Sequence, residues 1–218
     1  IITVEDPIEY HLKGVNQIQV KPKIGLNFAN TLRHIVRQDP DVIMVGEIRD
    51  LETAEIAIQA ALTGHLVFST LHTNDAASAI TRLLDMGVES FLLASTVRGI
   101  LAQRLVRVIC PQCKGPAAGL ENENGGNGNG GAKVPLQALA GKGCEYCAFT
   151  GYRGRTGIFE LITVDEHIRR LIMNKADVND IKEAARKNGT RTLFEDGTDK
   201  TMAGITTISE LLRVTQEA

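Results

Sequence analysis

Apolar positions in the first 105 residues recur at two spacings, one typical of strands and one typical of helices. Short apolar runs at residues 42–45 (VIMV) and 65–70 (HLVFST) predict buried strands. Between them, residues 51–63 have the spacing of a helix that Asp50 can cap and Gly64 can end. The expected buried face of this helix consists of Leu51, Ala54, Ile58, Ala61 and Leu62.

Further helices are expected along the chain. Asp75 precedes a helix over residues 76–86, which Gly87 ends, and a longer helix is expected from Ser90 to about Leu105. Strands that alternate with helices in this way predict an α/β fold whose parallel sheet is covered on both faces.

Residues 158–218 are also expected to be helical. Thr163 and Thr207 are candidate N-cap residues, and the spacing of Thr207 and Glu210 fits a capping box.

Residues 106–157 contain two pairs of cysteines, Cys110-x2-Cys113 and Cys144-x2-Cys147. This spacing indicates a metal site and a reducing compartment rather than disulfides. Four thiolates in two tight turns suit Zn²⁺ in a closed structural site. The alternative is four free, buried thiols.

Composition and charge argue against several classes of function. The chain has 24 basic and 26 acidic residues, a formal net charge of −2 and 4% aromatic residues, so a nucleic-acid-binding protein is not expected. The longest apolar region, residues 91–109, is interrupted by arginines, and neither a membrane span nor a signal peptide is predicted. Residues 121–131 (ENENGGNGNGG) are expected to form a flexible loop. A small basic cluster is explained as a solvated face or a protein contact: Lys133, Lys142, Arg153 and Arg155.

Two acidic segments follow strand-like runs. Glu47 ends the segment DVIMVGE, and Glu5 and Asp6 end ITVED. The carboxyl ends of parallel strands form the ligand crevice of an open sheet, where carboxylates hold Mg²⁺ or polarise water in nucleotide hydrolases. The alternative for Glu47 is a capped strand end with a solvated side chain, and the alternative for Glu5 and Asp6 is a polar turn.

Histidines and arginines flank these segments. His72 at a strand end could sense a phosphate, whereas the alternative for His65 and His72 is a side chain satisfied by the backbone. Guanidinium groups suit phosphate oxygens, and the alternative is surface ion pairing. The candidates are Arg33, Arg37 and Arg49, of which Arg33 and Arg37 are spaced to share a helix face.

Four segments together resemble one family, the hexameric ATPases of type II secretion and type IV pilus assembly. ITVEDPIEY resembles the aspartate box, RQDPDVIMVGEIRD an atypical Walker B segment, and TGHLVFSTLHTNDA the histidine box. The segment CPQC…CEYC, followed by TGYRGRTGIFEL, resembles the zinc-binding subdomain. The tetracysteine motif favours the secretion and pilus-assembly branches over retraction motors, and the segment LAQRLVRV favours secretion.

The resemblance implies three consecutive regions. Residues 1–105 would be the C-terminal half of a RecA-like ATPase core, residues 106–157 a tetracysteine zinc-binding subdomain, and residues 158–218 a helical subdomain. It also implies a homohexamer, peripheral on the cytoplasmic face of a bacterial inner membrane. Such a motor docks on inner-membrane platform proteins and uses Mg²⁺ and ATP to drive a pseudopilus and protein export.

The family's functional residues match individual positions of this chain. Glu47 matches the Walker B glutamate, and Glu5 the glutamate that activates water. His72 and the arginines Arg33, Arg37 and Arg49 match groups that act in catalysis. Asp6 and His65 match cofactor-binding positions, and the metal ligands are Cys110, Cys113, Cys144 and Cys147.

One family motif does not occur in the 218 residues. The phosphate loop G-x-x-x-x-G-K-[ST] is missing, since the single Gly-Lys pair, Gly141-Lys142, is followed by Gly143. Because the chain also begins at Ile1, it is interpreted as part of a longer protein and is expected not to hydrolyse ATP alone. The alternatives are a pilus-assembly ATPase, a non-catalytic zinc-stapled interaction module, and a zinc ribbon on nucleic acid, against which charge and aromatic content argue.

Overall fold

The computed structural model describes residues 1–117 and 139–216. The expected loop at residues 121–131 and Lys133 lie outside these described residues. The chain divides into two compact units, each built from two segments. Unit 1 comprises residues 1–100 and 162–188, and unit 2 comprises residues 101–161 and 189–218. The three consecutive regions expected from the sequence stay a prediction.

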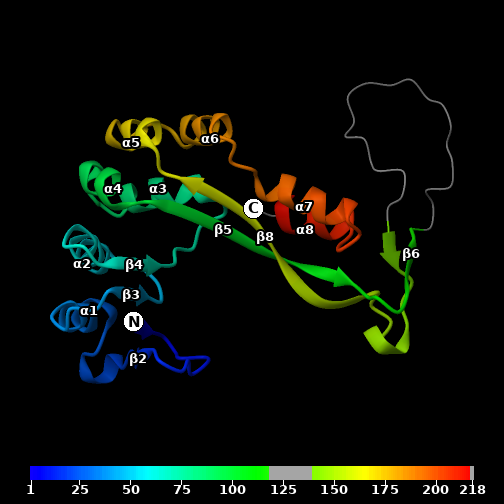
Figure 1. The fold of residues 1–218 in the computed structure, drawn as a ribbon, viewed down its shortest axis with the longest axis horizontal. Helices are drawn as coiled ribbons and strands as arrows, with labels where there is room; N and C mark the ends of the chain where they lie inside the picture. Colours follow the sequence, from blue (N-terminus) through cyan, green and yellow to red (C-terminus); the bar gives the residue numbers. More distant parts are fainter. Residues whose placement is uncertain (118–138, 217–218) are drawn as a thin grey trace. The chain divides into compact units, whose positions relative to one another are not determined.

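Unit 1 contains a four-stranded parallel sheet. Its strands are β1 (Ile2–Glu5), β2 (Asn16–Gln19), β3 (Val42–Val45) and β4 (Leu66–Ser69), in the order β2-β1-β3-β4 (Figure 1). Every pairing is parallel, so all four strands end at one edge of the sheet. The two strands predicted from apolar runs are therefore confirmed.

Two helices, α1 (Phe28–Val36) and α2 (Leu51–Leu62), pack on one face of this sheet. The core that they close contains Ile2, Val4, Val20, Leu32, Ile35, Ile43, Val45, Ala57 and Ala60. The opposite face is only partly covered, because Met44 is half-buried and Phe68, its neighbour in register, is 55% exposed. The expectations that β4 is buried and that both faces are covered were wrong here, since β4 is an edge strand in the described sheet.

Helix α2 begins where the sequence predicts. The Asp50 side chain accepts a hydrogen bond from Thr53 N at 2.8 Å, and Gly64 follows the helix with φ of 105°. The predicted buried face was partly wrong, because Leu51 and Leu62 are exposed. Small residues pack closest instead, and the buried positions are Thr53, Ala54, Ala57, Ile58 and Ala60.

Helix α3 (Ala76–Asp85) confirms the next prediction, with Asp75 as its N-cap and Gly87 after it. The long helix expected from Ser90 was wrong. Helix α4 covers only Ser90–Thr96, and strand β5 covers Gly99–Ile109. Exposed and less exposed positions alternate along β5 from Gly99 to Val108, which is the period of a strand, and the exposed positions include Leu101 and Leu105.

Helices α5 (Glu166–Met173) and α6 (Val178–Lys187) complete unit 1, together with the short 3-10 turn η1 (Pro22–Ile24). The N-cap of α5 is Asp165, which accepts from Ile168 N at 2.8 Å, and not Thr163, which ends a strand. Helix α5 contacts α4 and α6, and α6 also contacts α3.

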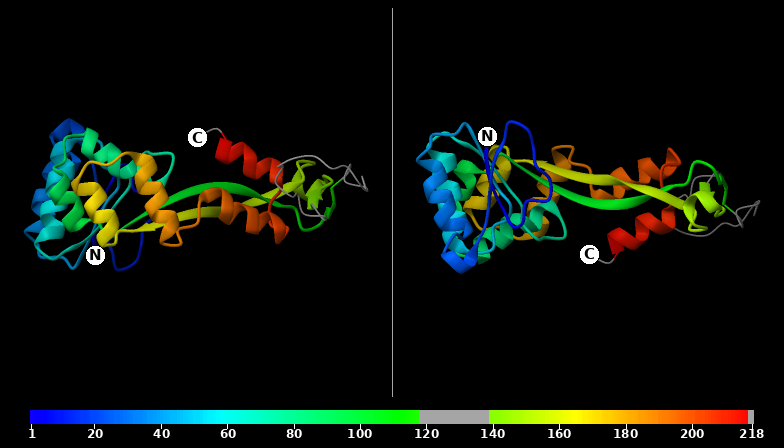
Figure 2. Two further views of the ribbon diagram at one scale, coloured as in Figure 1. Left: turned by 90° about the horizontal axis from the view of Figure 1, so that it is seen from above. Right: turned by 90° about the horizontal axis from the view of Figure 1, so that it is seen from below.

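Unit 2 is built mainly on β5 and β8 (Tyr152–Thr163), which lie side by side as a two-stranded sheet (Figure 2). Two short strands, β6 (Lys114–Pro116) and β7 (Leu139–Gly141), pair antiparallel near the 3-10 turn η2 (Glu145–Cys147). Helices α7 (Leu193–Met202) and α8 (Ile208–Gln216) follow. The core of the unit contains Val106, Ile158, Leu193 and Leu211.

A buried carboxylate ties α8 to β5 in unit 2. The Glu210 side chain has 0% exposure and accepts hydrogen bonds from Arg107 N (3.1 Å), Arg107 Nη2 (2.7 Å) and Arg213 Nη2 (2.7 Å). Thr207 Oγ1 accepts from Glu210 N at 3.2 Å, so the predicted N-cap is confirmed. The capping box was wrong, because the two arginines engage the Glu210 carboxylate that would complete it. These arginines hold the pKa of Glu210 well below its usual range, against the opposing effect of burial.

Among the described residues, no helix has the length and apolar character needed to cross a membrane.

We expect Glu210→Gln to lower the free energy of unfolding by about 2 kcal/mol at pH 7, because it removes a buried charge from two guanidinium partners that stay half-exposed. The folded-state pKa is depressed, so this stabilisation is present above the ordinary glutamate pKa of about 4.3 and is lost as the pH falls toward the folded value. The difference between wild type and variant should therefore shrink below about pH 4. Urea denaturation followed by circular dichroism measures it.

Glu183→Gln is the matched control, since Glu183 pairs with Lys187 at 2.7 Å on the exposed surface of α6. We expect a change within about 0.5 kcal/mol for the control. Equal effects of the two variants would contradict the role given to Glu210.

Candidate functional site

The carboxyl edge of the parallel sheet brings three chain segments close together. Gly46 N donates to Val4 O at 2.7 Å, which holds the end of β3 against the end of β1. A Cβ at position 46 would lie 3.1 Å from Val4 O and 3.4 Å from the Cα of Glu5. Glycine at position 46 therefore permits a close approach of the ends of β1 and β3, which a larger residue at this position would oppose.

Glu47 lies at the centre of this edge, with its side chain only 11% exposed. Its Oε1 is 2.6 Å from Arg49 Nη2, and its Oε2 is 3.3 Å from His72 Nε2. Three residues singled out separately in the sequence are thus neighbours in space. The arrangement offers one carboxylate between two groups that can carry positive charge.

The electrostatics of this cluster favour an ionised Glu47. The hydrogen bond from Arg49 lowers the pKa of Glu47 below its usual value, partial burial opposes this, and His72 adds a smaller lowering. The same contact raises the pKa of Arg49, to which the charge of Asp6 also contributes. Glu47 is therefore a carboxylate at neutral pH, able to accept a proton or to hold a cation.

The segment that carries His72 is attached directly to the Gly46–Ile48 turn. Thr70 Oγ1 donates to Gly46 O at 2.6 Å, and Ile48 N donates to Thr70 O at 3.0 Å. Sequence reasoning missed Thr70. Its position directly after β4 and two residues before His72 is the signal that could have found it.

Glu5 ends β1 and Asp6 follows it, at the same edge of the sheet. The Glu5 carboxylate accepts from Thr3 Oγ1 and, at 2.9 Å, from Gln17 Nε2. Because Asp6 acts electrostatically on Arg49, the acidic pair and the Glu47 cluster share one environment.

Three other candidate residues are not brought into this cluster. Arg33 Nη2 pairs with Glu52 between α1 and α2, and Arg37 is the C-cap residue of α1. His65 precedes β4, so it lies at the amino edge of the sheet, opposite His72. Its Nδ1 is 2.9 Å from Ala60 O, as the backbone-satisfied alternative expects.

Glu47 also fits a role toward a cation or a water molecule. Its Oε2 is buried, and the contact with His72 Nε2 at 3.3 Å lies at ion-pair distance without hydrogen-bond geometry, so within the described part of the chain this oxygen accepts no well-formed hydrogen bond. A buried carboxylate oxygen with unused acceptor capacity is suited to a metal-bound water or an attacking water.

A second candidate site is the cluster of Cys110, Cys113, Cys144 and Cys147, whose sulfur atoms all lie within 4.8 Å of one another. Three Sγ–Sγ distances are 3.9, 3.9 and 3.7 Å. Tetrahedral coordination at a Zn–S distance of about 2.3 Å places sulfurs about 3.8 Å apart. The four cysteines predicted as ligands are therefore together, in a geometry that can hold a metal ion.

Backbone geometry around the cysteines makes this cluster possible. A Cβ on Gly141 would lie 2.0 Å from Gly151 O, so the two chain segments can meet only as glycine backbones. Gly151 O also accepts from Cys110 N at 2.9 Å, which links the two halves of the cluster. Sequence reasoning found the cysteines but missed Gly141 and Gly151.

Two of the thiols have shifted pKa values. Burial acts to raise the pKa of Cys147, but hydrogen bonds from the backbone N–H groups of Cys144 and Gly151 outweigh it and lower the pKa to about 6. Burial raises the pKa of Cys113 to about 12. A thiol in a Cys-x-x-Cys motif commonly has a lowered pKa, and the thiolate is the form that binds a metal ion.

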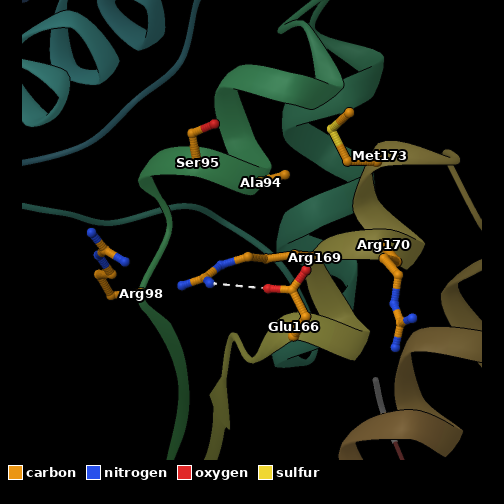
Figure 3. A pocket seen from close by; sticks show the side chains of 7 residues that line it. All are labelled: Ala94, Ser95, Arg98, Glu166, Arg169, Arg170 and Met173. Atoms are coloured by element: carbon orange, nitrogen blue, oxygen red, sulfur yellow. Dashed lines mark ion pairs between the residues drawn. The ribbon is translucent and has the colours of Figure 1, made fainter.

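A separate cavity of about 380 Å³ lies between α4 and α5 in unit 1 (Figure 3). It shares no residue with either site and was not anticipated from the sequence. Arg169 pairs with Glu166 at 3.5 Å and extends toward Arg98, whereas Arg170 points away from both (Figure 3). Its lining consists of Ala94, Ser95, Arg98, Glu166, Arg169, Arg170 and Met173.

Comparisons with known proteins agree over almost the whole chain. The chain is 56% identical over 217 residues to type II secretion system protein E of Pseudomonas aeruginosa, covering all of this chain and 43% of that protein. It is 52% identical over 216 residues to the type IV pilus assembly ATPase PilB of Thermus thermophilus, covering 99% of this chain and 24% of that protein. The solved structure of the pilus retraction motor PilT with bound ADP matches at 31% identity and a TM-score of 0.69, covering 98% of this chain and 52% of that chain.

The chain thus spans less than half the length of these curated relatives. The family model described as "Type II/IV secretion system protein" matches residues 1–213. Since this match takes in both the strand-end cluster and the cysteine cluster, we conclude that the chain belongs to the type II/IV secretion system protein family.

Proposed function

We propose that the protein to which this chain belongs hydrolyses ATP to power pseudopilus assembly and protein export by a type II secretion system. The observation that carries the proposal is the buried, ionised Glu47 held between Arg49 and His72 at the carboxyl edge of a parallel sheet. Relatives named type II secretion system protein E, one of them 56% identical, support the secretion branch.

In this proposal Glu47 accepts a proton from the attacking water or orients that water. Its Arg49 partner keeps it ionised, and His72 stands where it can hydrogen-bond to a phosphate oxygen or to the same water. Mg²⁺ and ATP, when bound, supply charge neutralisation and the transferable phosphoryl group. Glu5, at the same edge, is proposed to help activate the attacking water, and Asp6 to take part in binding the cofactor.

The remaining candidates are proposed with separate roles. Arg33 and Arg37 lie on α1, away from Glu47, and are proposed to act on phosphate across a subunit boundary of a homohexamer. His65 stays a predicted cofactor-binding residue, although its Nδ1 already contacts the backbone of α2.

Zinc is proposed as the occupant of the cysteine cluster, in a structural role. The four sulfurs at tetrahedral separations support this, because a closed site of four cysteines leaves no position for substrate. We further propose that the hexamer is peripheral on the cytoplasmic face of the inner membrane, on platform proteins of the secretion system.

The 218 residues alone are proposed to be inactive. They contain no G-x-x-x-x-G-K-[ST] segment to cradle the phosphates of ATP. Hydrolysis is therefore to be tested in the full-length protein, with the 218-residue chain as a comparison.

Two alternatives have specific support. The 52% identity to the pilus assembly ATPase PilB keeps a pilus-assembly motor open. A non-catalytic zinc-stapled interaction module is the other alternative, since the cysteine cluster needs no nucleotide. Assays of protein secretion and of pilus formation in a deletion strain distinguish a secretion ATPase from a pilus-assembly ATPase. Measured ATP hydrolysis by the full-length protein excludes the non-catalytic module.

We expect Glu47→Gln in the full-length protein to lower kcat for ATP hydrolysis by roughly 10²- to 10⁴-fold, because glutamine cannot accept the proton. Nucleotide affinity should change little. Phosphate release and binding of a fluorescent nucleotide measure the two effects.

The control for this variant is Glu183→Gln, on the exposed face of α6, which should leave kcat unchanged. Hydrolysis by Glu47→Gln at the wild-type rate would rule out the role given to Glu47.

We expect Cys110→Ser to abolish stoichiometric zinc binding and to unfold the segment around the cysteines, because small metal sites of this kind couple folding to binding. Elemental analysis should find one zinc per wild-type chain and much less in the variant. Glu145→Gln, beside the ligands but not one of them, should keep its zinc. A full equivalent of zinc in Cys110→Ser would show that the cluster is not the site.

A further inference from the structure

The segment from Thr70 to Asp75 holds His72 against Glu47, and it is fastened at both ends. At its start, Thr70 is bonded to the turn that carries Glu47. His72 itself is 88% exposed, so little packing fixes its imidazole. The distance of 3.3 Å between His72 and Glu47 therefore depends on the anchors of the segment.

Asp75 is the anchor at the other end, and both of its carboxylate oxygens are engaged. Oδ1 accepts from Ser78 N at 2.8 Å, which caps α3. Oδ2 accepts from Lys182 Nζ at 2.7 Å, and Lys182 belongs to α6. Thr73 Oγ1 also donates to Asp75 O at 3.1 Å, so the chain between His72 and Asp75 follows the position of Asp75.

The pair between Asp75 and Lys182 is better shielded than an ordinary surface ion pair. The Asp75 side chain is 21% exposed, and its pKa is lowered because hydrogen bonds from Lys182 and Ser78 outweigh its burial. By contrast, Lys187 and Glu183, also on α6, pair where both side chains are mostly exposed. Loss of the shielded pair leaves a half-buried carboxylate without its counter-charge, at the point where the His72 segment turns into α3.

We propose that Lys182 is a positioning residue, which through Asp75 holds the His72 segment in the geometry that places the imidazole beside Glu47. This inference rests on the proposed function. It makes α6, more than 100 positions after His72 in the sequence, part of the support of the strand-end site. A purely structural role, stabilising the contact between α3 and α6, is the competing explanation.

The test uses the full-length protein and two lysines of one helix. We expect Lys182→Met to lower kcat for ATP hydrolysis by roughly threefold to tenfold with an unchanged KM for ATP. Lys182→Arg, which keeps the charge, should restore most of the activity. Lys187→Met is the matched control and should behave as wild type.

Asp75→Asn provides a second variant that avoids the risk of unfolding. Asparagine is as good an N-cap as aspartate, so α3 keeps its cap while Lys182 loses its partner. In a double-mutant cycle, Lys182→Met should add little to the effect of His72→Gln, because both act on one group. Hydrogen exchange of residues 70–76, which needs no activity, should increase in Lys182→Met and in Asp75→Asn but not in Lys187→Met.

The outcomes separate this inference from the proposed function. Wild-type kcat and unchanged hydrogen exchange in Lys182→Met, in a protein that Glu47→Gln inactivates, would overturn the inference alone. Additive effects of Lys182→Met and His72→Gln would also overturn it, in favour of the structural explanation. A wild-type protein that does not hydrolyse ATP would remove the proposed function, and the inference with it.

Discussion

The contact between Gly46 and Val4 is the constraint from which the strand-end site follows. Parallel pairing sends every strand of the sheet toward one edge, and a hydrogen bond of 2.7 Å draws the end of β3 onto β1 there. The absence of a side chain at position 46 lets this happen without displacing the backbone of Glu5. Thr70 then binds Gly46 O, so the third strand end is attached to the same glycine. This backbone arrangement buries Glu47, and the contact with Arg49 keeps it ionised despite that burial, before any ligand is considered.

Sequence reasoning found the elements whose signals are local. The apolar run at residues 42–45 and the caps at Asp50 and Asp75 depend on neighbours within a few residues, and all were found. The strand at residues 99–109 was taken for a helix because its apolar residues, such as Leu101, Leu105 and Val108, recur at intervals of three and four residues, which is helical spacing. The buried face of α2 was partly missed because its packing partners lie on α1, α4 and β4, which a local pattern does not contain.

The same difference between local and long-range signals holds for the candidate sites. Glu47, Arg49 and His72 were proposed one by one, and the parallel register unites them. His65 was proposed because it lies in the same histidine-box segment as His72, but the length of strand β4 places it at the opposite edge of the sheet. In unit 2, the cysteine spacing identified a metal site, whereas the glycines that let its two halves touch carried no recognisable motif. The Glu210 side chain was expected to cap its own helix, because nothing near it in the sequence reveals Arg107 as its partner.

The order of segments in the two units has a practical meaning for anyone who dissects the chain. Unit 1 is closed by residues 162–188 and unit 2 by residues 189–218, so the chain passes from one unit to the other three times. A truncation near residue 105 would cut β5 and also strip α5 and α6 from the unit that holds the strand-end site. Loss of activity after such a deletion would therefore say nothing about the cysteine-bearing unit by itself. Point substitutions, by contrast, leave both units their full set of segments.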